Sequence, residues 1–152
     1  MRSIRLLGVA LLALPLLAPA PAASAARGRA VASRSFSGYD NATLHLIHAS
    51  GATLVEEGPA SGNLPGHVHA VLYVGTTFHG TFTIYTSHGE LYGRGSARLH
   101  NGGGAIETFS GVAEATGGSG QFRGAHGRGR LYGSFNRHTY RIVLQTRGTL
   151  QT

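Results

Sequence analysis

The chain has 152 residues, with 13 arginines and no lysine, six acidic residues, nine histidines, 24 glycines and no cysteine, and its formal charge is +7. This length fits one domain, and the lack of cysteine excludes disulfides, zinc–thiolate sites and thiol nucleophiles. Charged residues make up 12% and hydrophobic residues 41%, so the composition is not that of a disordered chain. The many glycines favour short strands and tight turns over long helices.

Residues 1–25 have the order of a secretory signal peptide. Two arginines precede a 12-residue apolar run, Leu6–Leu17, and the small residues of Ala18–Ala25 end in an Ala-x-Ala sequence. A bilayer span takes about 20 apolar residues, and Pro15 interrupts this run. We therefore expect cleavage after Ala25, a secreted protein with no transmembrane segment, and a mature chain of 127 residues with charge +5. Arginine in place of lysine, beside many alanines, indicates a GC-rich bacterial genome.

Residues 26–38 are small and polar and predict a flexible lead-in, and residues 39–152 predict one domain. In that domain apolar and polar side chains alternate in short segments, the pattern of half-buried β-strands. Gly58–Gly66 and Gly117–His126 are predicted loops. Eight strands are predicted, over Thr43–His48, Thr53–Glu57, His67–Gly75, Thr77–Tyr85, Leu91–His100, Ala105–Ala115, Gly127–Phe135 and Tyr140–Leu150.

The fold class predicted from these strands is all-β, an eight-stranded antiparallel barrel. Eight strands can close around packed side chains or around one small ligand. The apolar faces contain many glycines, which normally weaken a strand. In a tightly curved sheet they relieve crowding instead, so we expect them on the inner face.

A glycine-rich corner is the most specific segment of the chain. After the strand residues Phe109–Ala113, Thr116–Gly127 has the sequence TGGSGQFRGAHG. Together with the hairpin Gly80–Ser96 and the closing Gly148–Leu150, this segment resembles the allene oxide cyclase–dirigent barrel superfamily, and in particular its secreted bacterial members. The resemblance covers residues 77–150, about half of the chain.

The resemblance implies an eight-stranded barrel with an apolar lumen, often in a homo-oligomer. Characterised dirigent and cyclase members rely on acidic residues in the cavity. In this sequence only Glu107 falls in register with an apolar face, beside Phe109. The resemblance therefore implies the fold without implying the activity.

The expected lumen wall suits an apolar small molecule, because apolar pockets with few polar groups are typical ligand sites. The same side chains could also simply fill a core. Our first hypothesis is a non-enzymatic module that binds an apolar small molecule or a cell-envelope component; the alternative is a cyclase- or dirigent-like enzyme that shapes a reactive intermediate, with Tyr140 orienting the substrate. No cofactor is expected. The wall residues are Phe78, Phe82, Ile84, Leu91, Phe109, Leu131, Phe135, Tyr140 and Ile142.

Three histidines form a candidate metal site. His67 and His69 lie two residues apart, so their side chains leave one face of a strand about 7 Å apart, a spacing that can chelate a metal. His79 on the next strand is the candidate third ligand. The alternative is a solvated polar face in a histidine-rich chain. His45 and His48 are three residues apart, which predicts opposite faces of their strand.

Arginines dominate the expected exterior, with Tyr92 and Tyr132 between them. Such a surface suits anionic envelope polymers or lipid head groups, or it serves solubility alone. Nucleic acid is not expected as the partner of an exported protein, although arginines with interleaved aromatics can bind it. The predicted outward arginines are Arg94, Arg98, Arg128, Arg130, Arg141 and Arg147.

Overall fold

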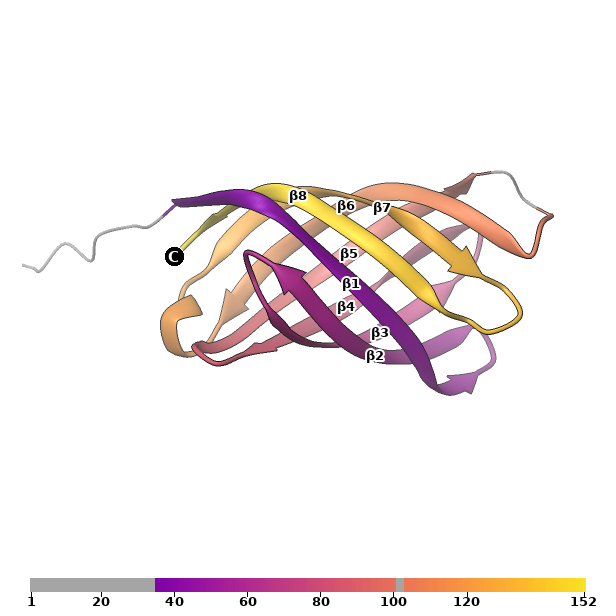
Figure 1. Ribbon diagram of the computed structural model, residues 1–152, viewed down its shortest axis with the longest axis horizontal. Helices are drawn as coiled ribbons and strands as arrows, with labels where there is room; N and C mark the ends of the chain where they lie inside the picture. The colour runs from indigo at the N-terminus through magenta and orange to yellow at the C-terminus, as the bar shows by residue number, and fades with distance from the viewer. Residues whose placement is uncertain (1–34, 101–102) are drawn as a thin grey trace, which may run out of the picture. The chain divides into compact units, whose positions relative to one another are not determined.

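Eight antiparallel strands form a closed barrel in chain order (Figure 1). The computed structural model describes residues 35–100 and 103–152. Pairing of the first strand with the last, with Leu44 opposite Ile142, closes the barrel. The predicted all-β antiparallel barrel is confirmed. Its elements are β1 (Ser35–Ser50), β2 (Thr53–Gly62), β3 (Gly66–Val74), β4 (Thr77–Thr86), β5 (Gly89–His100), β6 (Ile106–Gly118), the 3-10 turn η1 (Gly120–Phe122), β7 (His126–Asn136) and β8 (Ile142–Gln151).

The first two strands are longer than the sequence predicts. β1 begins at Ser35, so residues 35–38 of the expected lead-in belong to the barrel, and β2 continues through Gly58–Gly62, which was predicted as loop. Pairing with β1 and β3 on either side overrides the turn preference of this segment. Gly58 is required there, because a Cβ would collide with the backbone carbonyl oxygen of Thr43. The expected signal peptide, residues 1–25, lies outside the described residues, which contain no helix long and apolar enough to cross a membrane.

A β-bulge in β1 changes which side chains share a face. The register with β2 shifts between Leu46 and His48, so Ile47 is an extra residue. His48 pairs with Val55 and His45 pairs with Glu57, and both pairs lie on the outer face. The expectation that the two histidines lie on opposite faces was wrong, because strict alternation of side chains holds only for a strand without a bulge.

Inner-face glycines make room for phenylalanine rings from neighbouring strands. A Cβ on Gly93 of β5 would collide with the ring of Phe82 on β4. A Cβ on Gly133 of β7 would lie 2.7 Å from the ring of Phe109 on β6, closer than real Cβ contacts. At these two positions glycine therefore provides space for an aromatic ring inside the curved sheet.

The two ends of the barrel differ. At one end lie the β1–β2, β3–β4 and β7–β8 turns and the start of β6 (Figure 1). Three rings on strands that begin or end here are buried: Phe78 lies 6.0 Å from Phe109 and 5.2 Å from Phe135, centroid to centroid. We call this the aromatic end. The opposite end carries the β2–β3 and β4–β5 connections and the glycine-rich corner with η1 (Figure 1). We call it the corner end.

Candidate functional site

The lumen contains a cavity of about 330 Å³ to which all eight strands contribute. The size lies at the lower limit of typical ligand pockets, about 300–1000 Å³. Small inward residues leave this space open: Ala113 of β6, for example, has Gly95 and Gly129 as its partners on β5 and β7, and all three line the cavity. The cavity is thus a consequence of glycine and alanine at inward positions of neighbouring strands.

Seven of the nine predicted wall residues line this cavity: Phe78, Phe82, Ile84, Leu91, Phe109, Leu131 and Ile142. Phe135 does not. It is buried at the aromatic end, edge-on against Phe78.

Tyr140 does not face the lumen. β8 begins only at Ile142, so Tyr140 lies in the β7–β8 turn with φ of +57° and is 38% exposed. Its ring contacts Phe135 at a centroid distance of 6.1 Å. The turn geometry rather than strand alternation sets its direction, and it cannot orient a substrate in the cavity.

Asp40 is a site residue that the sequence prediction missed. Its carboxylate lies on the inner face of β1 and lines the cavity, and its register partner on β8, Thr146, also lines it. Asp40 Oδ1 accepts a 2.6 Å hydrogen bond from the backbone N–H of Leu64 in the β2–β3 loop. Counting back from Leu44 in steps of two residues places Asp40 on the inner face. The strand was predicted to start at Thr43, however, so Asp40 fell outside it. A predominantly apolar wall therefore carries one carboxylate, with the hydroxyl of Thr146 beside it.

The glycine-rich corner packs over the corner end. Backbone hydrogen bonds join Ser119 N–H to the Glu90 carbonyl at 2.8 Å and Gln121 N–H to the His88 carbonyl at 2.9 Å. Ser119 Oγ also accepts a 3.1 Å hydrogen bond from Glu90 N–H. Phe122 is buried against Leu91 and Leu150. The corner is thereby fixed to the β4–β5 hairpin at the edge of the cavity.

Glu107, the one inward carboxylate predicted, lies at the aromatic end and does not line the cavity. It is fully buried, accepts a 2.8 Å hydrogen bond from Arg137 Nη2 and a 3.0 Å hydrogen bond from Gly103 N–H. The hydrogen bond from Arg137 lowers the pKa of Glu107, against the opposing effect of burial. Glu107 joins the β5–β6 and β7–β8 turns, and its role is structural.

Glu56 is a third inward carboxylate and also lies away from the cavity wall. It is fully buried on β2 between its register partners Leu46 and Ala70. In the described part of the chain neither carboxylate oxygen has a hydrogen-bond partner. Loss of hydration raises the pKa of Glu56 to about 7.

The register does not assemble the predicted three-histidine site. His67 and His69 flank Glu57, with Nε2–Oε distances of 3.5 and 3.9 Å. On β4 the residue opposite His69 is Thr83, whereas His79 pairs with Tyr73 and stacks on it at 4.9 Å. Over residues 35–100 and 103–152, no three histidine or acidic side chains are placed to hold a metal ion.

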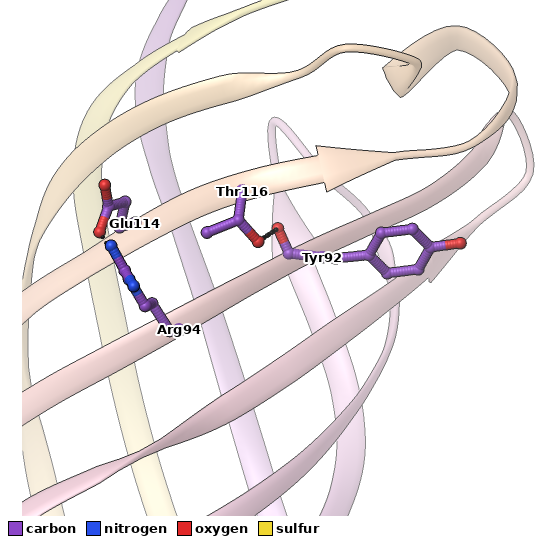
Figure 2. Close-up of polar contacts among 4 residues, drawn as sticks. All are labelled: Tyr92, Arg94, Glu114 and Thr116. Carbon is purple, nitrogen blue, oxygen red and sulfur yellow. Dashed lines mark hydrogen bonds and ion pairs between the residues drawn. The ribbon is translucent and has the colours of Figure 1, made fainter.

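The six predicted outward arginines are all exposed. Arg94 Nε donates a 2.8 Å hydrogen bond to Glu114 Oε2 (Figure 2), which lowers the pKa of Glu114. Beside this pair Thr116 is the extra residue of a bulge between β5 and β6, and its hydroxyl donates to the Tyr92 carbonyl at 3.4 Å. The Tyr92 hydroxyl donates a 2.6 Å hydrogen bond to Glu90, and Glu90 raises the pKa of Tyr92.

These features define a class of protein: a small closed β-barrel with an apolar lumen and one carboxylate in the cavity wall near the corner end. No protein-family model, curated protein or solved structure matches the chain.

Proposed function

We propose that the barrel is a binding module that holds one apolar small molecule in its lumen. The observation that carries this proposal is the cavity of about 330 Å³. Inward residues of a filled core are fully buried, but Phe82, Ile84 and Leu131 line this cavity and remain partly exposed. The order of residues 1–25 supports a role outside the cell.

The energetics of an apolar cavity support the same function. Side chains that face empty space lose the dispersion contacts that a packed interior provides. A ligand of matching shape restores these contacts and displaces water from apolar surface. The wall comes from every strand and is held by a continuous ladder, so the cavity exists before the ligand enters. A preformed site avoids the ordering cost of binding.

A neutral apolar fluorophore, N-phenyl-1-naphthylamine, tests the proposal. We expect its emission to rise on mixing with the protein and to saturate at one dye per barrel. Ala113→Phe should abolish the rise, because the new ring occupies the space beside Gly95 and Gly129. Ala49→Phe, on an exposed position of β1, is the matched control. No saturable rise, or equal binding by the Ala113→Phe variant, would reject the proposal.

Asp40 supports a second candidate function, a cyclase- or dirigent-like enzyme. Its carboxylate lines the cavity beside Thr146, where it can stabilise positive charge or accept a proton from a bound intermediate. The test is chiral chromatography of the products formed when a phenol is oxidised in the presence of the barrel. An enantiomeric excess that Asp40→Asn abolishes supports the enzyme, and a racemic product rejects it for this reaction class.

A further inference from the structure

Two arginines lie directly opposite each other on the outer face of β7 and β8. Arg130 and Arg147 are register partners, and both side chains are exposed. Direct partners on antiparallel strands have Cβ atoms about 4.5–5.5 Å apart, and like charges at this spacing destabilise the pair. In the described part of the chain neither arginine takes part in an ion pair. The chain thus keeps an uncompensated repulsion at this position.

The neighbouring carboxylate is already engaged. Among the described residues Glu114 is the one acidic side chain on the outer faces of β6, β7 and β8. It binds Arg94 at 2.8 Å (Figure 2), and it is the register partner of Arg128, whose charge also lowers its pKa. Arg130 and Arg147 therefore stay available for an anion from outside the chain.

Exposed aromatic rings border the two arginines. Tyr39 is the partner of Arg147 on β1 and is 61% exposed. Tyr132 follows Arg130 by two residues on the same face of β7 and is 39% exposed. We call Arg130, Arg147, Tyr39 and Tyr132 the Arg–Tyr patch. It combines two strong cations with two flat, amphipathic rings.

This combination fits a sugar ring with an anionic substituent. Guanidinium groups bind sulfate, phosphate or carboxylate oxygens through paired hydrogen bonds. A phenol ring has an apolar face that packs on the C–H groups of a sugar and a hydroxyl that hydrogen-bonds to it. Sites for single-stranded nucleic acid place stacking rings in a cationic groove, whereas this patch lies on the outer surface of a barrel.

We propose that the Arg–Tyr patch binds an anionic polysaccharide, at a site separate from the lumen. One charged substituent lies between the two guanidinium groups and relieves their repulsion, while the adjoining sugar rings lie on Tyr39 and Tyr132. The surface is independent of the apolar ligand of the lumen, so each site can be tested without the other.

Titration calorimetry with dextran sulfate, and with uncharged dextran of equal length, tests the proposal. The variant is Arg130→Gln/Arg147→Gln, and the matched control, Arg123→Gln/Arg141→Gln, removes two exposed charges elsewhere on the chain. We expect the patch variant to weaken dextran sulfate binding by about tenfold or more and the control by less than about twofold. The slope of log K against log salt should fall by about two in the patch variant. Tyr132→Leu should weaken binding without changing this slope.

Equal losses in the patch variant and in the control would overturn the proposal, because binding would then follow net charge alone. No dextran sulfate binding by the parent protein would also overturn it. A 20-nucleotide single-stranded DNA and phosphatidylglycerol vesicles serve as competitors. If either binds more tightly than dextran sulfate and loses affinity selectively in the patch variant, the partner is nucleic acid or a membrane instead. Melting curves show whether each variant remains folded.

Discussion

At the scale of single residues, two buried carboxylates make the stability of the fold depend on pH in opposite directions. Glu107 has Arg137 as a partner, which lowers its pKa, whereas Glu56 has only apolar register neighbours, and burial raises its pKa to about 7. A raised carboxyl pKa means that the folded protein retains a proton which the unfolded chain has already released. Stability is then lost as pH rises between the unfolded and the folded pKa.

For Glu56 this window runs from 4.5 to about 7. A shift of this size corresponds to a loss of about 3 kcal/mol in the free energy of unfolding across the window. Glu56→Gln removes the titration while retaining the shape. We expect the variant to be more stable than the parent by up to about 3 kcal/mol at pH 8 and close to it at pH 4, measured by urea unfolding. A difference that is the same at both pH values would show that Glu56 does not titrate in this range.

The pH dependence of stability expected from Glu107 has the opposite sign. Its lowered pKa contributes stability above the ordinary carboxyl pKa, and this contribution is lost as pH falls through the lower folded value. Glu107→Gln should lower Tm at pH 7, because the amide has one acceptor oxygen for two donors and no charge to pair with Arg137. The difference in Tm between variant and parent should narrow at acidic pH. Glu114→Gln breaks an exposed pair with the same 2.8 Å distance and should change Tm little. Equal Tm losses in the two variants would contradict the structural role given to Glu107.

At the scale of elements, glycines set how closely neighbouring strands and rings approach. Gly93→Ala places a methyl group against the ring of Phe82 and the carbonyl of Glu114. We expect a loss of about 1–3 kcal/mol in the free energy of unfolding, the usual cost of overpacking. Gly117→Ala is the control, since its nearest contact is Tyr92 Cδ2 at 3.9 Å. Urea unfolding of both variants measures the difference, and a Gly93→Ala variant as stable as the control would contradict the packing argument.

The strands also show which structural features the alternation of apolar and polar residues predicts. It predicted the eight strands and seven of the nine lumen residues, because inward and outward side chains differ in polarity along most strands. It placed His48 on the wrong face because a bulge adds one residue at Ile47. It placed Tyr140 inward because the start of β8 is set by the preceding turn.

Pairing information was needed for the remaining features of the site. Asp40 was missed because the first strand was predicted to start at Thr43, whereas pairing with Gly62 and Thr146 extends β1 back past Asp40. The prediction grouped His79 with His69 for the same reason, because the register between β3 and β4 cannot be read from either strand alone. Alternation predicts the face on which a side chain lies but not its neighbour across the ladder.

At the scale of the whole molecule, stability and the proposed ligand binding compete for the same space. The backbone ladder closes around the barrel, while the lumen retains about 330 Å³ that side chains do not fill. Filling part of this volume adds apolar contacts that the parent lacks. A protein selected for stability alone would carry larger residues at inward positions such as Ala113. The small residues of the wall leave the lumen open instead.

Ala113→Leu tests this competition directly. The added side chain enters the cavity between Gly95 and Gly129, so we expect the free energy of unfolding to rise by about 1–2 kcal/mol. The same variant should bind N-phenyl-1-naphthylamine at least about tenfold more weakly, because the dye and the leucine need the same volume. Ala49→Leu, on the exposed part of β1, should change neither quantity. A stabilised variant that still binds the dye with the parent affinity would show that the dye binds outside the lumen, and a destabilised variant would show that no space was available at Ala113.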